Sequence, residues 1–323
     1  GSEVAALERE LATVVGRRYG VAVSSGTAAL YAALRALGVS KGDRVVIPSY
    51  VCTALLNAVY QAGAIPILSD VDPATGNITV DTVKKALRRR TRAAIVPHLF
   101  GTPADARAIE RLGVPVIEDC AQCLGTRKGR GKVGGLTTVS VFSFYATKLI
   151  AAGEGGMIAT NDREIARRVQ DMRAYDKRDT YTPGFNYKLS DLHAAVARTQ
   201  LTRLPDMIER RRARARRYAR VLDRVPGICL PAPESRSGSV FYRYVVNVGA
   251  GAAGLVESLS RQRVECARPV YKPLHRYLGE KGFPGAEEAY RVALSLPIYP
   301  GLSLKAIVDV GRRLTHLLEG RGV

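Results

Sequence analysis

Three segments of the sequence carry residues that could act together on one small molecule. Residues 23–30, VSSGTAAL, run from a strand pattern into a helix pattern; exposed N–H groups and the positive dipole end attract an anion there, and Thr27 adds a hydroxyl. Asp119 ends an apolar run, where open α/β sheets bind ligands, and a carboxylate buried there needs a cation. Ser143 and Lys148 follow another apolar run, and a lysine entering a cleft at the sheet edge can act as a nucleophilic amine.

Each of these segments alone is more often structural, but their combination has a specific use. Together they supply a phosphate cradle, a partner for a ring cation and an amine that can form a Schiff base. Pyridoxal 5'-phosphate needs all three groups. The sequence therefore predicts this cofactor.

Two glycine-rich segments resemble nucleotide-binding loops only in part. GAGAAG at 249–254 has the form of a dinucleotide fingerprint, but no acidic residue follows about 20 positions later, near Pro269. TRKGRGKV at 126–133 lacks the first glycine of a phosphate loop and has Val133 where Ser or Thr should stand. We interpret the first as a strand-to-helix loop and the second as a surface hairpin. A nicotinamide-dependent enzyme that uses GAGAAG is a minor alternative.

The elements that must position these residues alternate along the first half of the chain. Short, almost wholly apolar runs alternate with helical patterns from residue 19 to about 160, which is typical of a largely parallel sheet covered on both faces. After an Arg-rich helix and a turn-rich stretch, further strand and helix patterns follow. We expect a large α/β domain over residues 1–204 and a small α+β C-terminal domain over residues 205–323.

The composition excludes several classes of protein. The 323 residues are 46% hydrophobic and 24% charged, which excludes a wholly disordered or collagen-like chain. No apolar run approaches the roughly 20 residues of a membrane-spanning helix. The N-terminus GSEVAALERELA has no signal-peptide pattern. We therefore expect a cytoplasmic protein that does not bind membranes.

The charge balance is strongly basic. Lys and Arg number 49 against 29 Asp and Glu, a formal net charge of +20. The densest basic stretch, residues 208–224, reads as a helix with its arginines on the solvated faces. No zinc-finger spacing, RNP-like strand or basic zipper accompanies it, so nucleic-acid binding is not expected. A basic surface would also attract an anionic small molecule such as a nucleotide conjugate.

The cysteines do not form a recognisable framework. Their odd number, five, in a chain without a signal pattern argues against a set of disulfides. Cys120 and Cys123 form a CxxC motif, but no second pair completes a zinc site. We expect no metal and interpret these two as small buried residues beside a strand end.

The motifs resemble, in order and spacing, those of the DegT/DnrJ/StrS-type sugar aminotransferases, pyridoxal-phosphate enzymes of the aspartate-aminotransferase fold. The resemblance implies a three-layer α/β/α large domain with a mostly parallel sheet, and a small α+β C-terminal domain. It covers nearly the whole chain, and an ordered series is far more specific than any one motif. The segments that carry it are VAVSSGTAALYAALRALGVSKGDRVVIPSY, DVDPATGNI, PHLFGTPAD, VIEDCAQCLG, FSFYATK, GEGGMIATND, GFNYKLSDLHAA, ARPVYKPLH and LSLPIYPGL.

The resemblance implies roles for individual residues around the cofactor. Lys148 would hold it as a Schiff base and shuttle the proton, while Asp119 would pair with the pyridinium nitrogen. Gln122 would approach the ring hydroxyl. The residues that would hold the phosphate are Gly26, Thr27 and Ser143.

The resemblance also implies residues contributed by a partner or facing the substrate. In this family the site is shared across a homodimer, so Asn186 of GFNYK would reach the partner's phosphate. Cys52 aligns with the position from which the family places a flat residue on the cofactor ring, and Tyr50 lies two residues before it. The residues expected on the substrate side are Tyr50, Arg268 and His275.

The predicted activity is transamination of a keto sugar, nucleotide-linked, with glutamate or glutamine as amino donor. Such a reaction serves amino-sugar, polysaccharide or secondary-metabolite biosynthesis. The segment RPVYKPLH is closest to members that act at sugar C4. Some relatives replace the lysine with His and are sugar dehydratases, so Lys148 favours amino transfer. The alternatives are such a dehydratase-like relative or a regulatory sensor that keeps the fold and the cofactor pocket.

Overall fold

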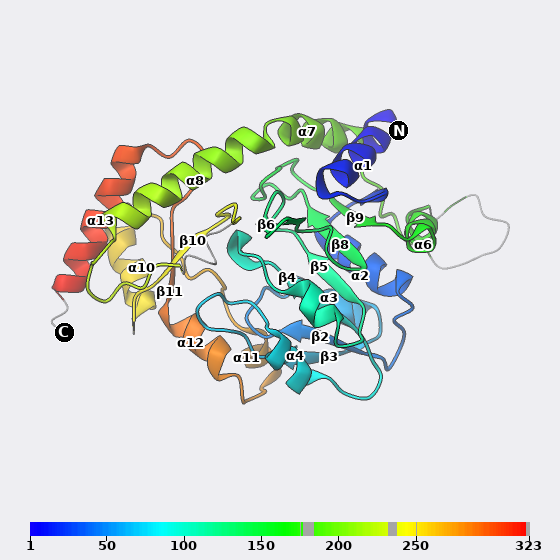
Figure 1. Ribbon diagram of the computed structural model, residues 1–323, viewed down its shortest axis with the longest axis horizontal. Helices are drawn as coiled ribbons and strands as arrows, with labels where there is room; N and C mark the ends of the chain where they lie inside the picture. Colours follow the sequence, from blue (N-terminus) through cyan, green and yellow to red (C-terminus); the bar gives the residue numbers. More distant parts are fainter. Residues whose placement is uncertain (175, 177–183, 232–237, 250, 321–323) are drawn as a thin grey trace.

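A seven-stranded sheet forms the framework of the protein (Figure 1). The computed structural model describes residues 1–174, 176, 184–231, 238–249 and 251–320. The strand order is β1-β9-β8-β5-β4-β2-β3, and among the described strands of this sheet only β9 runs against its neighbours. The strands are β1 (Tyr19–Val23), β2 (Arg44–Pro48), β3 (Ile65–Ser69), β4 (Thr91–Pro97), β5 (Val116–Asp119), β8 (Val139–Ser143) and β9 (Gly156–Thr160). This arrangement confirms the predicted mostly parallel α/β fold.

Helices cover both faces of the sheet because its strands are apolar on both sides. One buried cluster joins one face to α2 through α6, and a second joins the other face to α1 and α7. The helices are α1 (Ser2–Val15), α2 (Gly26–Ala36), α3 (Ala54–Gln61), α4 (Val80–Ala86), α5 (Ala106–Glu110), α6 (Arg163–Arg173) and α7 (Asp191–Thr202), with a 3-10 turn η1 (Leu99–Gly101) after β4. The three layers are those expected from the alternating pattern.

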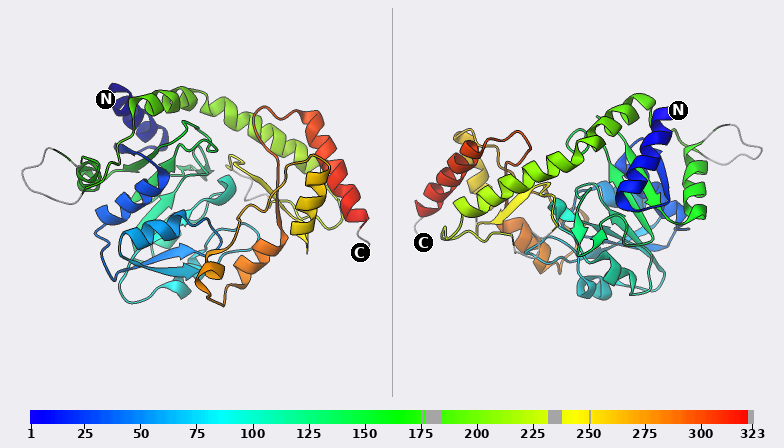
Figure 2. Two further views of the ribbon diagram at one scale, coloured as in Figure 1. Left: turned by 180° about the vertical axis from the view of Figure 1, so that it is seen from behind. Right: turned by 45° about the horizontal axis from the view of Figure 1, so that its top comes forward.

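The C-terminal part builds a separate buried cluster around a two-stranded antiparallel sheet. Its elements are α8 (Leu204–Val221), β10 (Tyr244–Asn247), α10 (Ala252–Arg261), α11 (Leu274–Leu278), α12 (Pro284–Val292), β11 (Ala293–Leu296) and α13 (Leu304–Glu319). Helices α1 and α13 lie at opposite ends of the molecule (Figure 2). Leu274 of α11 and Ala289 of α12, however, pack into the core of the large sheet. The division after residue 204 falls at the start of α8 and stays a prediction.

Some arginines of helix α8 contact neighbouring segments, whereas the sequence predicted that they face solvent. Ile208, Ala215 and Tyr218 are buried on one face, as the helical pattern predicted. Arg211 and Arg214, however, donate to backbone carbonyl groups of segments packed beside the helix. The prediction that the arginines all lie on solvated faces is therefore wrong. The pattern could not show this, because a long guanidinium stem can reach carbonyls far from its own backbone.

Two smaller expectations can also be compared with the structure. The basic segment 126–133 forms a hairpin in which β6 (Arg127–Lys128) pairs with β7 (Gly131–Lys132) and both strands are largely exposed, as predicted. No helix within the described residues is both long and apolar enough to cross a bilayer.

Candidate active site

A cavity of about 240 Å³ opens where β4, β5 and β8 end. The parallel arrangement of these strands brings their carboxyl ends to one edge of the sheet, which is where open α/β sheets bind ligands. The cavity is lined by seven of the residues expected around the cofactor: Gly26, Thr27, Cys52, Asp119, Gln122, Ser143 and Lys148. Lys148 and Asp119 therefore face a common space.

The turn from β1 into α2 forms one end of the cavity. Ser25 caps α2, with its side chain accepting a hydrogen bond from the N–H of Ala28 at 3.1 Å. A Cβ at Gly26 would lie 2.8 Å from the Cβ of Ser143, so a larger residue cannot occupy this position without displacement. The close approach brings the positive end of α2 and the Ser143 hydroxyl together. This donor set fits a phosphate.

Asp119 is a nearly buried carboxylate that faces the cavity. Its Oδ1 accepts one hydrogen bond, from the N–H of Ala121 at 3.0 Å. Burial raises the pKa of Asp119, and the Ala121 hydrogen bond and the charge of Lys148 only partly oppose this. Among the described residues it has no ion-pair partner. A protonated ring nitrogen would supply the missing cation, so the position fits a pyridinium.

Gln122 is oriented by a backbone hydrogen bond. Its Oε1 accepts from the N–H of Phe100 at 2.8 Å. Because a backbone N–H can only donate, this bond fixes the amide oxygen toward Phe100 and leaves the NH₂ group as the part available to a ligand. Gln122 can therefore present a donor to an oxygen atom in the cavity.

Lys148 lies in the loop after β8, where its N–H donates to the carbonyl of Tyr145 at 2.8 Å. Its Nζ lies 5.5 Å from the centre of the Tyr242 ring. No ion pair to Lys148 occurs within the described ranges. The amine is thus available to react while an aromatic face shields one side of it.

Cys52 lines the same cavity from the segment between β2 and α3. The residue is exposed through the cavity, yet enough protein surrounds its thiol that desolvation raises the pKa of Cys52. A small thiol therefore stands where the family resemblance would place a flat ring.

The three residues expected on the substrate side lie elsewhere. Tyr50 is buried, with its hydroxyl 3.4 Å from the carbonyl of Ala289. His275 forms side-chain hydrogen bonds with Ser49 at 2.5 Å and Glu287 at 2.6 Å. Arg268 lies over the ring of Tyr290, its Cζ 4.2 Å from the centre. None of the three lines the cavity. The motif gave their order in the chain but not the direction of their side chains.

Asn186 lies on an exposed segment before α7. The next residue, Tyr187, accepts a hydrogen bond through its carbonyl from the N–H of Ser24 at 2.8 Å, so the segment runs beside the turn that begins α2. The contact of Asn186 with a partner protomer stays a prediction.

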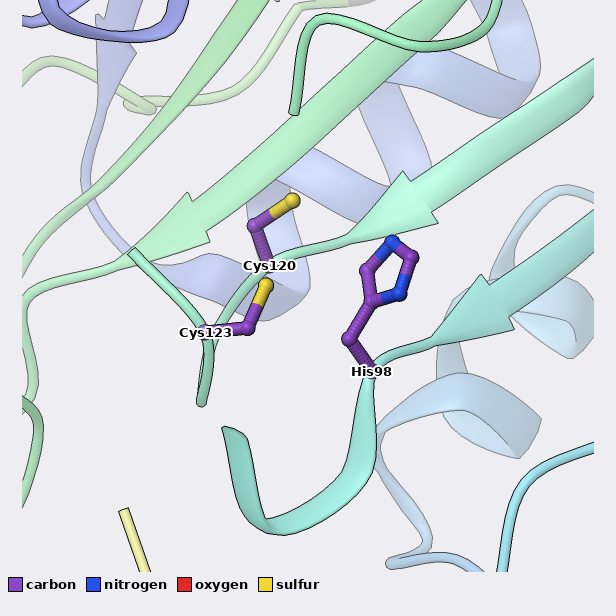
Figure 3. Close-up of side chains that lie close together, drawn as sticks. All are labelled: His98, Cys120 and Cys123. Atoms are coloured by element: carbon purple, nitrogen blue, oxygen red, sulfur yellow. The ribbon is translucent and has the colours of Figure 1, made fainter. Parts of the chain in front are cut away.

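A buried group that the sequence reasoning did not bring together lies beside the cavity, which His98 also lines. His98, Cys120 and Cys123 come together there, with their potential ligand atoms within 4.8 Å of one another (Figure 3). The Nδ1 of His98 accepts the N–H of Ala104 at 2.9 Å, so Nε2 carries the proton and donates to Glu118 at 3.2 Å. The imidazole has no free lone pair, and the arrangement favours a structural role over a metal site.

Glu118 anchors this buried group. It accepts hydrogen bonds from the N–H groups of Gly134, Leu136 and Thr137 at 2.8–3.0 Å. Burial alone would raise the pKa of Glu118, but the hydrogen bonds from His98 and these amides outweigh it and lower the pKa. The sequence shows that Glu118 directly precedes Asp119 in the motif. It does not show which of these two carboxylates is surrounded by hydrogen-bond donors.

Comparison with known proteins gives consistent results over the whole chain. The model of the DegT/DnrJ/EryC1/StrS aminotransferase family matches residues 1–315. The chain is 31% identical to the spore coat polysaccharide biosynthesis protein SpsC of Bacillus subtilis, covering 99% of this chain and 90% of that protein. It is 33% identical to a UDP-N-acetyl-3-dehydro-alpha-D-glucosamine 3-aminotransferase of Acidithiobacillus ferrooxidans, with the same two coverages. The crystal structure of the aminotransferase TlmJ from Streptoalloteichus hindustanus superimposes with a TM-score of 0.94 at 33% identity, covering 100% of this chain and 92% of that chain.

Proposed function

We propose, on the premise that the chain belongs to the DegT/DnrJ/EryC1/StrS aminotransferase family, that it transfers the amino group of glutamate or glutamine to a nucleotide-linked keto sugar. The aminotransferases of this family depend on pyridoxal phosphate, and the protein is an enzyme of that kind. When bound, the cofactor supplies an electron sink and a carrier for the amino group. The observation that supports the assignment of its site is the single cavity shared by Lys148, Asp119 and the α2 turn.

The α2 turn and Ser143 anchor the cofactor in this proposal. Gly26 and Thr27 offer backbone N–H groups at the positive end of α2, and the hydroxyls of Thr27 and Ser143 complete the cradle. A fixed phosphate restricts how the ring can lie, which limits the orientations in which it meets the amine.

Asp119 and Gln122 orient the ring and set its charge. The buried carboxylate of Asp119 would stabilise a proton on the ring nitrogen, because an ion pair relieves the cost of burying either charge alone. Gln122 would donate from its NH₂ group to the ring oxygen, since its own oxygen accepts from the N–H of Phe100. Cys52 contributes a small apolar wall to the same space.

Lys148 acts at its Nζ in two ways. Lys148 would attach the cofactor and, when its amine is free, would accept and return a proton at the reacting carbon. Lys148 and Asp119 are therefore the catalytic residues of the proposal: Lys148 would react at its Nζ, and Asp119 would hold the proton on the ring nitrogen.

The nature of the sugar is inferred from the relatives and the charge. One relative is named as a 3-aminotransferase of a UDP-linked keto sugar, and another belongs to polysaccharide biosynthesis. The net charge of +20 would attract a nucleotide diphosphate. The carbon that is aminated, for which RPVYKPLH favours C4, stays a prediction.

The assembly and location are also part of the proposal. The exposed segment with Asn186 begins beside the α2 turn, where a second copy could complete the phosphate site in a homodimer. All five cysteines are unpaired, which fits the reducing conditions of the cytoplasm.

The test is a screen of nucleotide-linked keto sugars with glutamate and glutamine, followed by mass spectrometry of the products. The proposal predicts an amino sugar from at least one pair of substrates with the unmodified enzyme and none with Lys148→Ala. A chain that binds pyridoxal phosphate but aminates no keto sugar would contradict the proposed substrate class.

A further inference from the structure

The segment 239–243 approaches the catalytic lysine in a conformation that the surrounding protein imposes. Phe241 has a φ of +47°, a left-handed conformation that a large aromatic residue rarely adopts. Such conformations persist only where neighbouring contacts determine them, and they occur often at functional sites. The contacts on either side of Phe241 must therefore hold the segment in this conformation.

Arg211 of α8 holds this segment from one side. Its Nη1 lies within hydrogen-bonding distance of the carbonyls of Phe241 (3.1 Å), Tyr242 (3.2 Å) and Ile298 (3.0 Å). Burial lowers the pKa of Arg211, and no carboxylate pairs with it among the described residues. A partly buried guanidinium whose hydrogen bonds go to carbonyls fixes the backbone, and it leaves the side chains of the segment free for other contacts.

The loop after β4 supports the segment from the other side. Gly101 has a φ of +88°, and a Cβ there would lie 3.0 Å from the backbone nitrogen of Tyr242. The N–H of Arg243 donates to the carbonyl of Phe100 at 3.3 Å. Phe100 in turn donates to Gln122 of the cofactor cavity. The segment is thus linked rigidly to the site.

This arrangement places Lys148 and Arg243 around the ring of Tyr242, beside the cofactor cavity. The Nζ of Lys148 lies 5.5 Å, and the Cζ of Arg243 6.0 Å, from the centre of the Tyr242 ring. Tyr242, Arg243 and Thr147 also line a second cavity, of about 230 Å³, next to the catalytic lysine. Lys148 itself lines the first cavity, and Thr147, the residue before it, lines the second, so the two cavities meet the same loop.

Arg243 has no anionic partner within the described part of the chain. Within the described residues, its side chain donates one hydrogen bond, to the hydroxyl of Ser295 at 3.4 Å. Glu265 lines the same cavity but forms no ion pair with Arg243. A guanidinium in this setting is suited to bind a carboxylate with two parallel hydrogen bonds.

We propose that Arg243 binds a carboxylate of the amino-acid donor, and that Arg211 positions it by holding the segment 239–243. An α-amino acid carries a carboxylate on the same carbon as its reacting amine, so the charge must lie near Lys148. The diphosphate of a nucleotide sugar is attached at the anomeric carbon, several bonds from an amination site elsewhere on the ring. The inference rests on the proposed amino transfer from an amino acid.

The test uses the holoenzyme reduced with borohydride, which cannot turn over, and 2-oxoglutarate as the probe in titration calorimetry. We expect Arg243→Gln to weaken binding of 2-oxoglutarate by about 10- to 100-fold, the range for loss of a charge-assisted pair, and Arg243→Lys to weaken it less. Arg291→Gln, which removes a guanidinium paired with Glu288 on α12, is the matched control and should bind as the unmodified protein does.

The outcomes separate this inference from the proposed function. If Arg243→Gln keeps its visible cofactor band and binds 2-oxoglutarate as tightly as the unmodified protein, or if the unmodified reduced protein does not bind it, the role of Arg243 is wrong while the cofactor assignment stands. If no cofactor band forms in the unmodified protein, the proposed function fails first. Unchanged binding of a nucleotide sugar in Arg243→Gln would support assignment to the donor, whereas an equal loss would overturn it.

Discussion

Glu118 and Asp119 are consecutive carboxylates at the end of β5, yet their pKa values shift in opposite directions. Glu118 accepts hydrogen bonds from three backbone amides and His98, and its pKa is lowered. Asp119 accepts one, and burial raises its pKa. Because adjacent strand residues point to opposite faces, one carboxylate lies in the protein interior and the other in the cavity. The first supports the fold, and the second is left for a cationic ligand.

We expect Asp119→Asn to stabilise the cofactor-free protein at neutral pH. A carboxyl group with a raised pKa in the folded state favours folding at low pH, and this contribution is lost as the pH rises through that pKa. Removing the charge should therefore raise the melting temperature by a few degrees at pH 7 and leave it unchanged near pH 3. Thermal unfolding between these pH values measures the difference.

Bound pyridoxal phosphate should make the melting temperature of the unmodified protein higher than that of Asp119→Asn. With pyridoxal phosphate bound, the unmodified protein should gain more in melting temperature than Asp119→Asn, because only the carboxylate pairs with a ring cation. An Asn variant that is less stable without the cofactor, or gains as much from it, would contradict the role of Asp119.

Glu118→Gln should show the opposite stability profile. A lowered pKa contributes stability above the ordinary pKa of a glutamate, and this contribution is lost as the pH falls through the folded-state value. Gln cannot accept all the hydrogen bonds of the carboxylate, so the variant should lose about 1–3 kcal/mol at pH 7. Urea unfolding at pH 7 and pH 3 checks this; a loss of equal size at both would rule out the charge as its cause.

Gly26→Ala should weaken cofactor binding by displacing the phosphate cradle. The added Cβ would lie 2.8 Å from the Cβ of Ser143, and overpacking of this kind costs about 1–3 kcal/mol. The dissociation constant for pyridoxal phosphate, from absorbance titration, should rise about 5- to 150-fold. The control is Gly301→Ala, where the nearest atom is 3.8 Å away. Equal affinity in both variants would show that the cradle does not hold the phosphate.

Arg211→Met should destabilise the protein although Met fills much of the same space. Three carbonyls lose a donor, and the free energy of unfolding should fall by about 2–4 kcal/mol. Arg216→Met, which removes an exposed guanidinium paired with Glu209 on the same helix, should change it by less than about 1 kcal/mol. Denaturant titration compares the two, and similar losses would remove the basis for treating Arg211 as a clamp.

The sequence predicted the fold and part of the cavity from local pattern, whereas Cys52 and Gln122 were expected there only from the family resemblance. Strand ends in a parallel sheet meet at one edge, so Asp119, Ser143 and Lys148 could be placed together from apolar runs alone. The turn before α2 was readable from Gly26 and its neighbours. Roles for these residues came from the order of the motifs and stay predictions until tested.

The contacts between distant segments could not be predicted in the same way. His275 lies in a motif, but its ring turns to Ser49 and Glu287 in the interior, and no periodicity encodes that direction. Arg243 lies outside any recognised motif, and it shares the ring of Tyr242 with Lys148 only through tertiary packing. Side-chain direction across long sequence separations is decided by tertiary packing.

The central claim is that Lys148 carries the cofactor, and peptide mapping after borohydride reduction tests it most directly. The protein is incubated with pyridoxal phosphate, reduced, digested and examined by mass spectrometry. Lys272→Ala is the matched control, since Lys272 also lies over a tyrosine ring, 4.4 Å from the centre of Tyr277, but outside the cavity. The account predicts that the reduced cofactor is on the peptide with Lys148 in the unmodified protein and in Lys272→Ala, and is absent from Lys148→Ala. Attachment at another lysine, or equal labelling of Lys148→Ala, would contradict it.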